Sequence, residues 1–261
     1  MCKHFSPPAL SLRFIPVWQR NFLVWKKLAI PSILGNLADP AFYMLGLGFG
    51  LGALLPHVGG TSYLAFLASG TVCYSTMNSA SFEALYAGFS RMHVQKTWDA
   101  ILNTPLTLDD VLLGELVWTV SKSLLSGLAI LVIVWAMGLY ENFALSLWTI
   151  PVIVLMGYCF TGMALVMNSV SPNYDFFMYY FTLVITPMVL LCGVFFPPEQ
   201  LPAFLRGLSA WLPLHHGIAL VRPLLQGLAP EHAVRHVLAL IVWGSACYYI
   251  ALGLTRRRLL T

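Results

Sequence analysis

The sequence predicts an all-α polytopic membrane protein with six membrane-spanning helices. Its 261 residues are 59% hydrophobic and only 9% charged, whereas about a quarter of the residues of a soluble domain are charged. The mean hydropathy is +0.78. The apolar residues gather into long runs, and a helix needs roughly 20 such residues to cross a bilayer. Lipid is therefore expected to be the main solvent of this chain.

The charge and the cysteines argue against several other classes. The net charge of +4 does not indicate a nucleic-acid partner, because the basic residues lie in short segments between the apolar runs. Four of the five cysteines lie inside apolar runs and Cys2 is near the terminus, so no disulfide framework is predicted. The first thirty residues lack an apolar core followed by a small-residue cleavage site, so no removed signal peptide is expected.

Residues 1–31 are predicted to form an N-terminal tail and an interfacial helix. Trp18, Phe22 and Trp25 share one helical face, and most basic residues of this segment fall elsewhere around the helix axis. This pattern is typical of a helix in the membrane interface, with its aromatic face toward the lipid and its basic side chains toward the phosphates. Residues 1–12 fit a disordered basic tail better.

Residues 32–261 are predicted to form one six-span membrane domain. The spans are expected at about 32–55, 63–89, 111–139, 144–167, 176–196 and 237–254. Six spans place both termini on one side of the membrane. With the termini inside, the cytoplasmic segments hold ten of the fourteen lysine and arginine residues, and the outer segments hold three. The positive-inside rule therefore predicts cytoplasmic termini.

The polar stretch Arg91–Leu106, between the second and third spans, is predicted to be a cytoplasmic lever. A helix here would carry an apolar face with a bulky tryptophan, and it would end before Pro105, because the residue before a proline avoids the α region. Such a face suits a groove on a partner protein; an amphipathic loop that rests on the lipid headgroups is the open alternative. The residues expected to couple to a partner are Arg91, Val94, Lys96, Thr97, Trp98, Asp99, Ile101 and Leu102.

A phosphate-binding loop is absent from the sequence. None of the five lysines follows a glycine, so the pattern G-x-x-x-x-G-K-[ST] does not occur. We therefore expect no catalytic site and no cofactor in this chain, and any nucleotide must be hydrolysed by another polypeptide. His232 and His236 are spaced to ligate zinc on one helical face, but the surrounding stretch lacks cysteine, so no metal site is predicted.

Four ionisable residues lie within predicted spans, namely Asp39, Glu83, Glu115 and Lys122. Charges inside a membrane are costly and usually face the bundle interior or water. Glu115 and Lys122 are seven residues apart on one face of the third span, so we expect Lys122 to reach toward Glu115 or Glu83. The four residues are candidate gate residues, and structural neutralisation without substrate contact is the alternative.

Several stretches of the sequence resemble the membrane subunits of type-2 ABC exporters. Gly193–Pro197 and the Pro-Leu-x-His-x5-Arg pattern from Pro213 to Arg222 resemble the signature of that family. The segment Val94–Leu102 is similar to its coupling helix. The segments that resemble the NodJ-type branch, whose members export nodulation lipo-chitooligosaccharides, are Trp25-Lys-Lys, Leu34–Pro40 and Leu183–Pro187.

The resemblance implies a half-transporter that works as a homodimer with two separate NodI-type ATPase subunits, which bind ATP and Mg²⁺. It implies an interfacial elbow helix, a coupling helix that docks in the ATPase, and outer re-entrant helices between spans five and six. The implied cargo is a lipo-oligosaccharide or similar acylated or lipid-linked glycan, exported across the bacterial inner membrane. The expected outer gate and signature residues are Phe195, Phe196, Pro197, Pro213, His216 and Arg222.

A cargo of this kind needs aromatic platforms and hydrogen-bonding groups for its sugars, and an apolar groove for its acyl chain. Spans one, two and five offer both. The candidate residues of a substrate path are Tyr74, Asn78, Phe82, Tyr86, Phe177 and Phe181. Two alternatives stay open: an ABC exporter of a hydrophobic drug or antibiotic, and an intramembrane enzyme that uses Glu83, Glu115 and histidines as its reaction centre.

Overall fold

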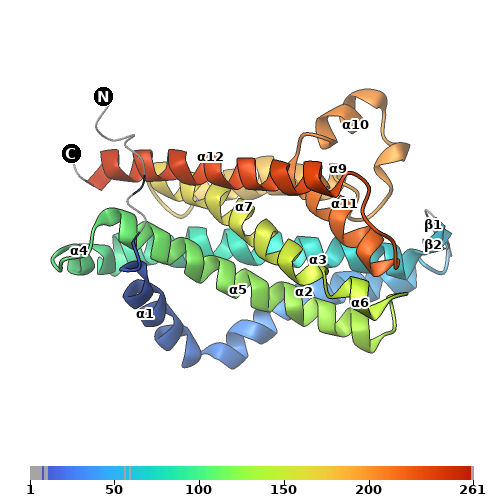
Figure 1. Ribbon diagram of the computed structural model, residues 1–261, viewed down its shortest axis with the longest axis horizontal. Helices are drawn as coiled ribbons and strands as arrows, with labels where there is room; N and C mark the ends of the chain where they lie inside the picture. Colours follow the sequence, from blue (N-terminus) through green and yellow to red (C-terminus); the bar gives the residue numbers. More distant parts are fainter. Residues whose placement is uncertain (1–7, 9–10, 56, 59, 260–261) are drawn as a thin grey trace.

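The protein is an elongated bundle of helices (Figure 1). The computed structural model describes residues 8, 11–55, 57–58 and 60–259. The predicted tail therefore lies mostly outside the described residues, Cys2 included. In the part that is described, every long element is helical, and the strands are two residues each. The predicted all-α class is confirmed.

The elements follow one another along the chain with short connections. In order they are α1 (Phe14–Lys26), α2 (Ala29–Gly50), β1 (His57–Val58), β2 (Thr61–Ser62), α3 (Tyr63–Phe82), the π-turns η1 (Glu83–Ala87) and η2 (Ser90–Val94), α4 (Thr97–Leu102), α5 (Leu108–Ala136), α6 (Phe143–Ser146), α7 (Thr149–Val170), α8 (Phe176–Tyr180), the π-turn η3 (Phe181–Ile185), α9 (Thr186–Leu191), the 3-10 turn η4 (Pro198–Gln200), α10 (Ala203–Ser209), α11 (Pro213–Leu225) and α12 (Ala233–Leu259).

The core lies between the long helices α3, α5, α7 and α12. Helix α7 packs against the other three, and the shorter α11 closes the bundle near one end. Met77, Ile130 and Phe160 are fully buried in this core. Each such side chain contributes about 1.5–3 kcal/mol when it leaves water; in a membrane, the tight van der Waals packing between helices takes over this role.

Helices α7 and α12 approach closely where glycine faces glycine. A Cβ atom added to Gly162 would lie 2.8 Å from the carbonyl oxygen of Gly244, closer than real Cβ atoms come. Small residues at a helix crossing allow this approach. The C-terminal end of α12 is held by an ion pair between Arg256 and Asp109, at the start of α5, with an N–O distance of 2.5 Å.

Gly162→Ala is expected to lower the stability of the folded chain by about 1–3 kcal/mol, because the new methyl group meets the backbone of α12. The measurement is thermal unfolding in detergent. Gly46→Ala is the matched control, because Gly46 is also inside a helix and an added Cβ would meet open space. Equal stability of the two variants would contradict the close crossing.

Three helical segments among the described residues are long and apolar enough to cross a membrane, namely α5, Phe143–Val170 and α12. The pair of α1 and α2, bent by 85°, makes a fourth if it counts as one span. Serine and threonine side chains along α3 lower its hydropathy, and the helix of the fifth predicted span is short. The protein is thus a multi-pass membrane protein, and the count of six spans stays a prediction.

The elbow helix α1 packs its aromatic face on the protein. Trp18 Nε1 donates to Ser121 Oγ of α5 at 3.1 Å, and the rings of Phe22 and Trp25 lie 6.5 and 5.9 Å from the ring of Trp118. The expectation that this face turns to the lipid is therefore wrong. The hydrogen-bonding partner on α5 and the indole of Trp118 offer the aromatic groups a better surface than the headgroups do.

The predicted lever is not one helix over Arg91–Leu106. The helix that begins with α3 continues through the two π-turns to Val94, five residues beyond the predicted end of the second span. The chain then breaks at Lys96, whose φ is +49°, and the six residues of α4 follow. Arg91 consequently belongs to the end of the long helix and not to the lever.

Candidate coupling site at one end of the bundle

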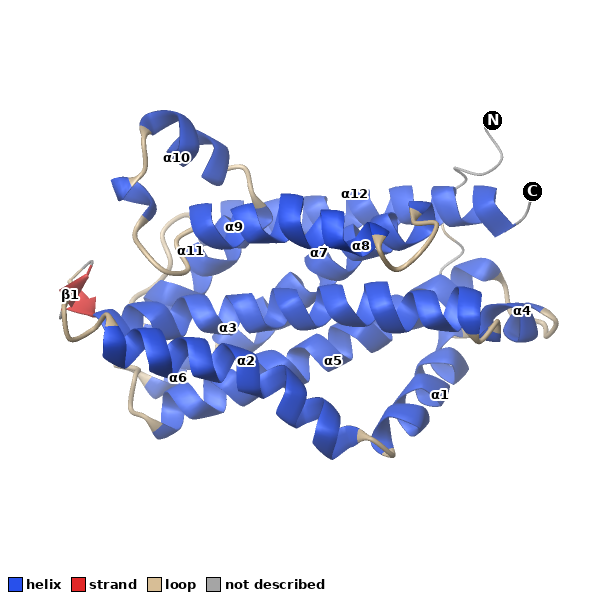
Figure 2. Cartoon of the chain, turned by 180° about the vertical axis from the view of Figure 1, so that it is seen from behind, coloured by secondary structure: helices blue, strands red, loops and turns tan. Residues whose placement is uncertain are grey.

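Helix α4 lies at one end of the bundle (Figure 2). A buried network of charges joins the helices beside it. Arg91 at the end of the long helix forms ion pairs with Glu115 of α5 at 2.6 Å and with Glu83 at 3.0 Å. Lys122, two turns along α5 from Glu115, pairs with Glu83 at 2.6 Å. The carboxylate side chains of Glu83 and Glu115 are 4% and 2% exposed. We call these four residues the charge network.

The π-turns place two members of the charge network on one face. In a regular α-helix, residues eight apart are offset by about 80° around the axis. A π-turn closes its hydrogen bond one residue later than an α-turn does, which reduces this offset. Glu83 begins η1 and Arg91 lies in η2, and their side chains meet. The local widening of the helix thus makes the ion pair.

Neutral donors satisfy the carboxylates further. Trp118 Nε1 donates to Glu83 at 2.7 Å, and Asn21 Nδ2 of α1 donates to Glu115 at 3.1 Å. Trp98 Nε1 of α4 donates to Glu115 over a longer 3.4 Å. A buried ion pair is tolerated when such extra hydrogen bonds complete its geometry. The charge network therefore connects α1, α4, α5 and the end of the long helix in one polar joint.

Trp98 is buried inside the protein and is not a surface residue of α4. Its side chain is 1% exposed, and its indole faces Glu115. The prediction that the Trp98 side chain fits a groove of a partner is therefore wrong, and the Arg91 side chain, which is 11% exposed, is also turned into the bundle. The sequence shows that α4 has an apolar face, but the elements that cover this face come from distant parts of the chain.

The surface that remains for a partner is mostly polar. Val94 is 64% exposed, and Lys96 and Asp99 are also exposed. Thr97, Ile101 and Leu102 are half-buried. Thr97 Oγ1 accepts a hydrogen bond from Arg20 of α1 at 3.2 Å, which ties the start of α4 to the elbow helix. Of the predicted coupling residues, Val94, Lys96 and Asp99 are thus the most accessible.

Asp39 lies apart from the charge network. Its carboxylate accepts a hydrogen bond from the hydroxyl of Tyr74 on α3 at 3.2 Å, and the ring of Tyr74 contacts that of Tyr43 at 6.1 Å. The structure therefore groups three of the four predicted intramembrane charges and separates the fourth. The pairing of Lys122 with Glu83 is one of the two pairings expected from the sequence. The sequence did not predict that Arg91 pairs with both Glu83 and Glu115.

Four of the predicted substrate-path residues form one aromatic cluster. The ring centroids of Phe82 and Phe181 are 4.7 Å apart, and those of Tyr86 and Phe177 are 5.3 Å apart. The cluster lies where η1 and the end of α3 meet α8 and η3. Phe82 is 46% exposed, so the cluster reaches the surface of the chain. Tyr74 and Asn78 lie further along α3 and are half-buried.

The signature residues organise the opposite end of the bundle. Arg222 of α11 donates to Ser69 Oγ at 3.0 Å and to the carbonyl oxygen of Gly193 at 2.6 Å, and its guanidinium lies 3.7 Å from the ring centre of Phe66. Gly193 has a φ of +86°, which favours glycine. Pro213 begins α11, and the Phe195 carbonyl oxygen accepts a hydrogen bond from Tyr63. Phe196 and Pro197 follow directly as part of the same half-buried turn.

His216, the signature histidine, forms a pair that sequence reasoning missed. Its Nδ1 lies 2.8 Å from Nδ1 of His236, so one nitrogen donates to the other. Burial is the main cause that lowers the pKa of His216 to about 4, and the neighbouring His236 is the second. The imidazole of His216 is therefore neutral at neutral pH. In the part of the chain that is described, no group of three or more His, Cys, Asp or Glu side chains is arranged to hold a metal ion.

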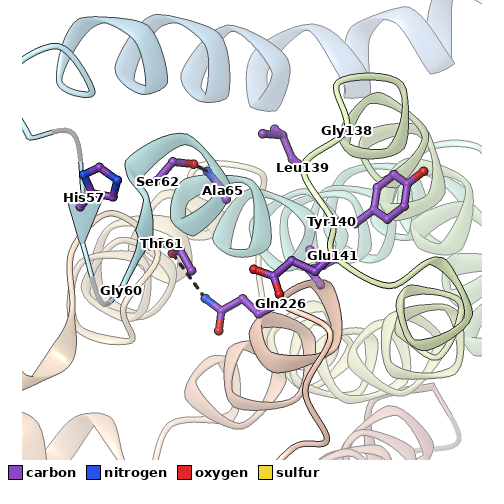
Figure 3. Close-up of a pocket in the computed structure, with 11 residues that line it drawn as sticks. His57, Gly60, Thr61, Ser62, Ala65, Gly138, Leu139, Tyr140, Glu141 and Gln226 are labelled. Atoms are coloured by element: carbon purple, nitrogen blue, oxygen red, sulfur yellow. Dashed lines mark hydrogen bonds between the residues drawn. The ribbon is translucent and has the colours of Figure 1, made fainter.

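A polar pocket of about 320 Å³ lies at this same end, far from the charge network. It is formed by the β1–β2 turn, the segment after α5 and the end of α11. Figure 3 shows the side chains of Glu141, Gln226 and Thr61 turned toward one another, whereas the ring of Tyr140 points away. Gln226 Nε2 donates to Thr61 Oγ1 at 3.5 Å. The pocket offers hydroxyl, amide and carboxylate groups to a polar ligand.

The helical membrane fold, the α4 joint and the signature turn define a class of transport protein. Residues 13–225 match the family of the ABC-2 type transporter, and the chain belongs to this family. It is 47% identical to Nodulation protein J of Bradyrhizobium diazoefficiens over 253 residues. The matched region covers 97% of this chain and 96% of that protein. Nodulation protein J of Rhizobium meliloti is 44% identical, with the same coverage. The inner membrane transport permease YadH of Escherichia coli is 22% identical over 92% of this chain and 93% of its own length.

Proposed function

We propose that this chain is the membrane subunit of an ATP-driven exporter of a lipo-oligosaccharide or similar acylated glycan. It works as a homodimer with two separate ATPase subunits in the bacterial inner membrane, with both termini in the cytoplasm. The full-length similarity to proteins named Nodulation protein J supports the choice of cargo. The observation that carries the mechanism is the charge network, which joins the short helix α4 to the spans.

The ATPase subunits bind ATP and Mg²⁺, and this chain receives the resulting movement at α4. The exposed residues Val94, Lys96 and Asp99 meet the ATPase. Displacement of α4 moves Trp98, which contacts Glu115, and Glu115 is held by Arg91. Movement then passes into α5 and into the long helix that begins with α3. Because buried ion pairs have few alternative partners, the joint transmits displacement and resists shear.

The aromatic cluster lies next along the same path. Phe82 directly precedes Glu83 on the long helix, and Tyr86 follows it by three residues. A movement of the charge network therefore also displaces these two rings. Aromatic faces bind both sugar rings and acyl chains, because they combine apolar area with a polarised π-system. We assign the cluster to the substrate path, with Tyr74 and Asn78 further along it, and the turn of Phe195–Pro197 to the outer gate.

The cargo class is tested by the ATPase activity of the assembled complex in proteoliposomes. We expect a purified lipo-chitooligosaccharide to stimulate ATP hydrolysis, and a panel of hydrophobic drugs to leave it at the basal rate. Stimulation by the drugs alone would contradict the proposed cargo and support a drug exporter. Enzymatic turnover by this chain without an ATPase would contradict the exporter assignment altogether.

Lys96→Glu is expected to weaken binding of the ATPase subunit by about five- to tenfold, because it reverses a charge on the exposed side of α4. The measurement is the dissociation constant of the ATPase for membranes that contain the variant. Lys27→Glu, an equally exposed lysine that follows α1, is the matched control and is expected to bind normally. If both variants weakened ATPase binding equally, docking of the ATPase at α4 would be contradicted.

A further inference from the structure

A second cavity, of about 350 Å³, lies between the elbow helix α1 and the charge network. Arg20 and Trp25 line it from α1, and Glu83, Arg91, Trp118 and Lys122 line it from the bundle. Its volume is within the range of small-ligand sites. The charge network forms one wall of this cavity, and α1, which contacts the network through Asn21, forms the opposite wall.

The cavity carries one positive charge more than its carboxylates neutralise. Arg91 and Lys122 pair with Glu83 and Glu115. Arg20 is the third cation, and in the described part of the chain its guanidinium donates only to neutral acceptors, Asn21 Oδ1 at 3.0 Å and Thr97 Oγ1 at 3.2 Å. The nearby carboxylate of Glu115 attracts Arg20 but is already paired with Arg91, so the cavity keeps one net positive charge and favours an anionic ligand.

The remaining wall of the cavity is apolar. Val24, Trp25 and Leu28 of α1 and its following turn line it, and Val24 and Leu28 are 56% and 64% exposed at the surface of the chain. A cationic end next to an apolar, tryptophan-bearing wall is the arrangement that proteins use at the boundary of lipid and water. The ligand that fits both ends is an amphiphile with one negative headgroup.

We propose that this cavity binds the headgroup of an anionic phospholipid from the leaflet beside α1, with Arg20 and Lys122 as the phosphate ligands. The Lys122 ammonium has three donors and spends one of them on Glu83. Arg20 has five donors and spends two on Asn21 and Thr97. Because Arg20 also holds the start of α4, the bound lipid fixes the elbow helix against the coupling helix.

The inference goes beyond the proposed function, since it names neither the exported cargo nor the ATPase. It is tested on the purified full-length chain alone, in a neutral detergent. Dioctanoyl-phosphatidylglycerol, dioctanoyl-phosphatidylcholine and inorganic phosphate are titrated separately, and bound molecules are counted by native mass spectrometry. We expect the anionic lipid to bind about tenfold more tightly than the zwitterionic one, which corresponds to one charge-assisted contact.

Arg20→Gln is expected to abolish this preference, and Arg20→Lys, which keeps the charge, is expected to restore much of it. Lys26→Gln removes the same charge from an exposed position of the same helix and is expected to keep the preference. Gel filtration checks that each variant is folded. If Arg20→Gln does not fold, the wild-type preference and its retention by Arg20→Lys carry the test.

Two results would overturn the lipid site. One is equal binding of the two lipids, or an unchanged preference in Arg20→Gln. The other is binding of inorganic phosphate as tight as that of the anionic lipid, which would assign the cavity to a soluble anion. Since no ATPase and no cargo are present, neither result bears on the proposed export function.

Discussion

An Arg91→Met variant is expected to lose about 3–5 kcal/mol of stability and all measurable export. Arg91 is the cation that two buried carboxylates share, and removal of one partner of a buried ion pair leaves an uncompensated charge. In the variant, Lys122 still pairs with Glu83, whereas the remaining hydrogen-bond donors to Glu115 in the described part of the chain are neutral. The measurement is thermal unfolding of the variant in detergent, together with export from whole cells.

The control for this prediction is Lys96→Met, which removes an exposed cation five residues after Arg91 in the chain. Its stability is expected to remain near that of the wild type. The double variant Arg91→Met with Glu115→Gln is expected to recover part of the loss, because it also removes one of the unpaired charges. An Arg91→Met protein as stable as Lys96→Met would contradict the charge network.

A Trp98→Ala variant is expected to hydrolyse ATP with its partner but to export roughly tenfold less cargo per ATP, a coupling loss of ordinary size for two linked sites. The indole is the buried contact between α4 and Glu115, so its removal disconnects α4 from the charge network. The ATPase is expected to bind normally, because the exposed residues of α4 are unchanged. The measurement is the ratio of cargo exported to ATP hydrolysed in proteoliposomes.

Two further variants separate the causes. Trp98→Phe keeps the buried ring and removes the N–H donor, so it is expected to lie between the wild type and Trp98→Ala. Trp148→Ala removes a tryptophan that is 65% exposed and is expected to export normally. If Trp98→Ala instead weakened binding of the ATPase and left the export ratio unchanged, Trp98 would be a docking residue after all.

Composition and apolar run length were sufficient to predict the fold class. A chain with so few charged residues is expected to lie in lipid, where water cannot bond to the backbone. Helices satisfy the hydrogen bonds of every backbone group internally. The number of spans did not follow as directly. Helix α3 is buried and carries hydroxyl groups, and α1 and α2 meet at a sharp bend, so hydropathy alone does not decide which segments cross.

The candidate site was predictable only where its residues share one helix. Glu115 and Lys122 lie on one face of α5, and this spacing was enough to expect an acid partner for Lys122. The role of Arg91 depends on two π-turns, and the local sequence pattern does not predict these turns. The burial of Trp98 depends on the packing of α4 against α5, and the contact of Arg222 with Ser69 spans 153 positions of the chain.

The most direct test of the account is the export ratio of Trp98→Ala, measured at saturating ATPase subunit in proteoliposomes. If α4 acts through the buried charge network, the cargo exported per ATP falls roughly tenfold while ATP hydrolysis continues. If the ratio equals that of the wild type under the same conditions, movement reaches the spans by another route, and the charge network is only a structural joint.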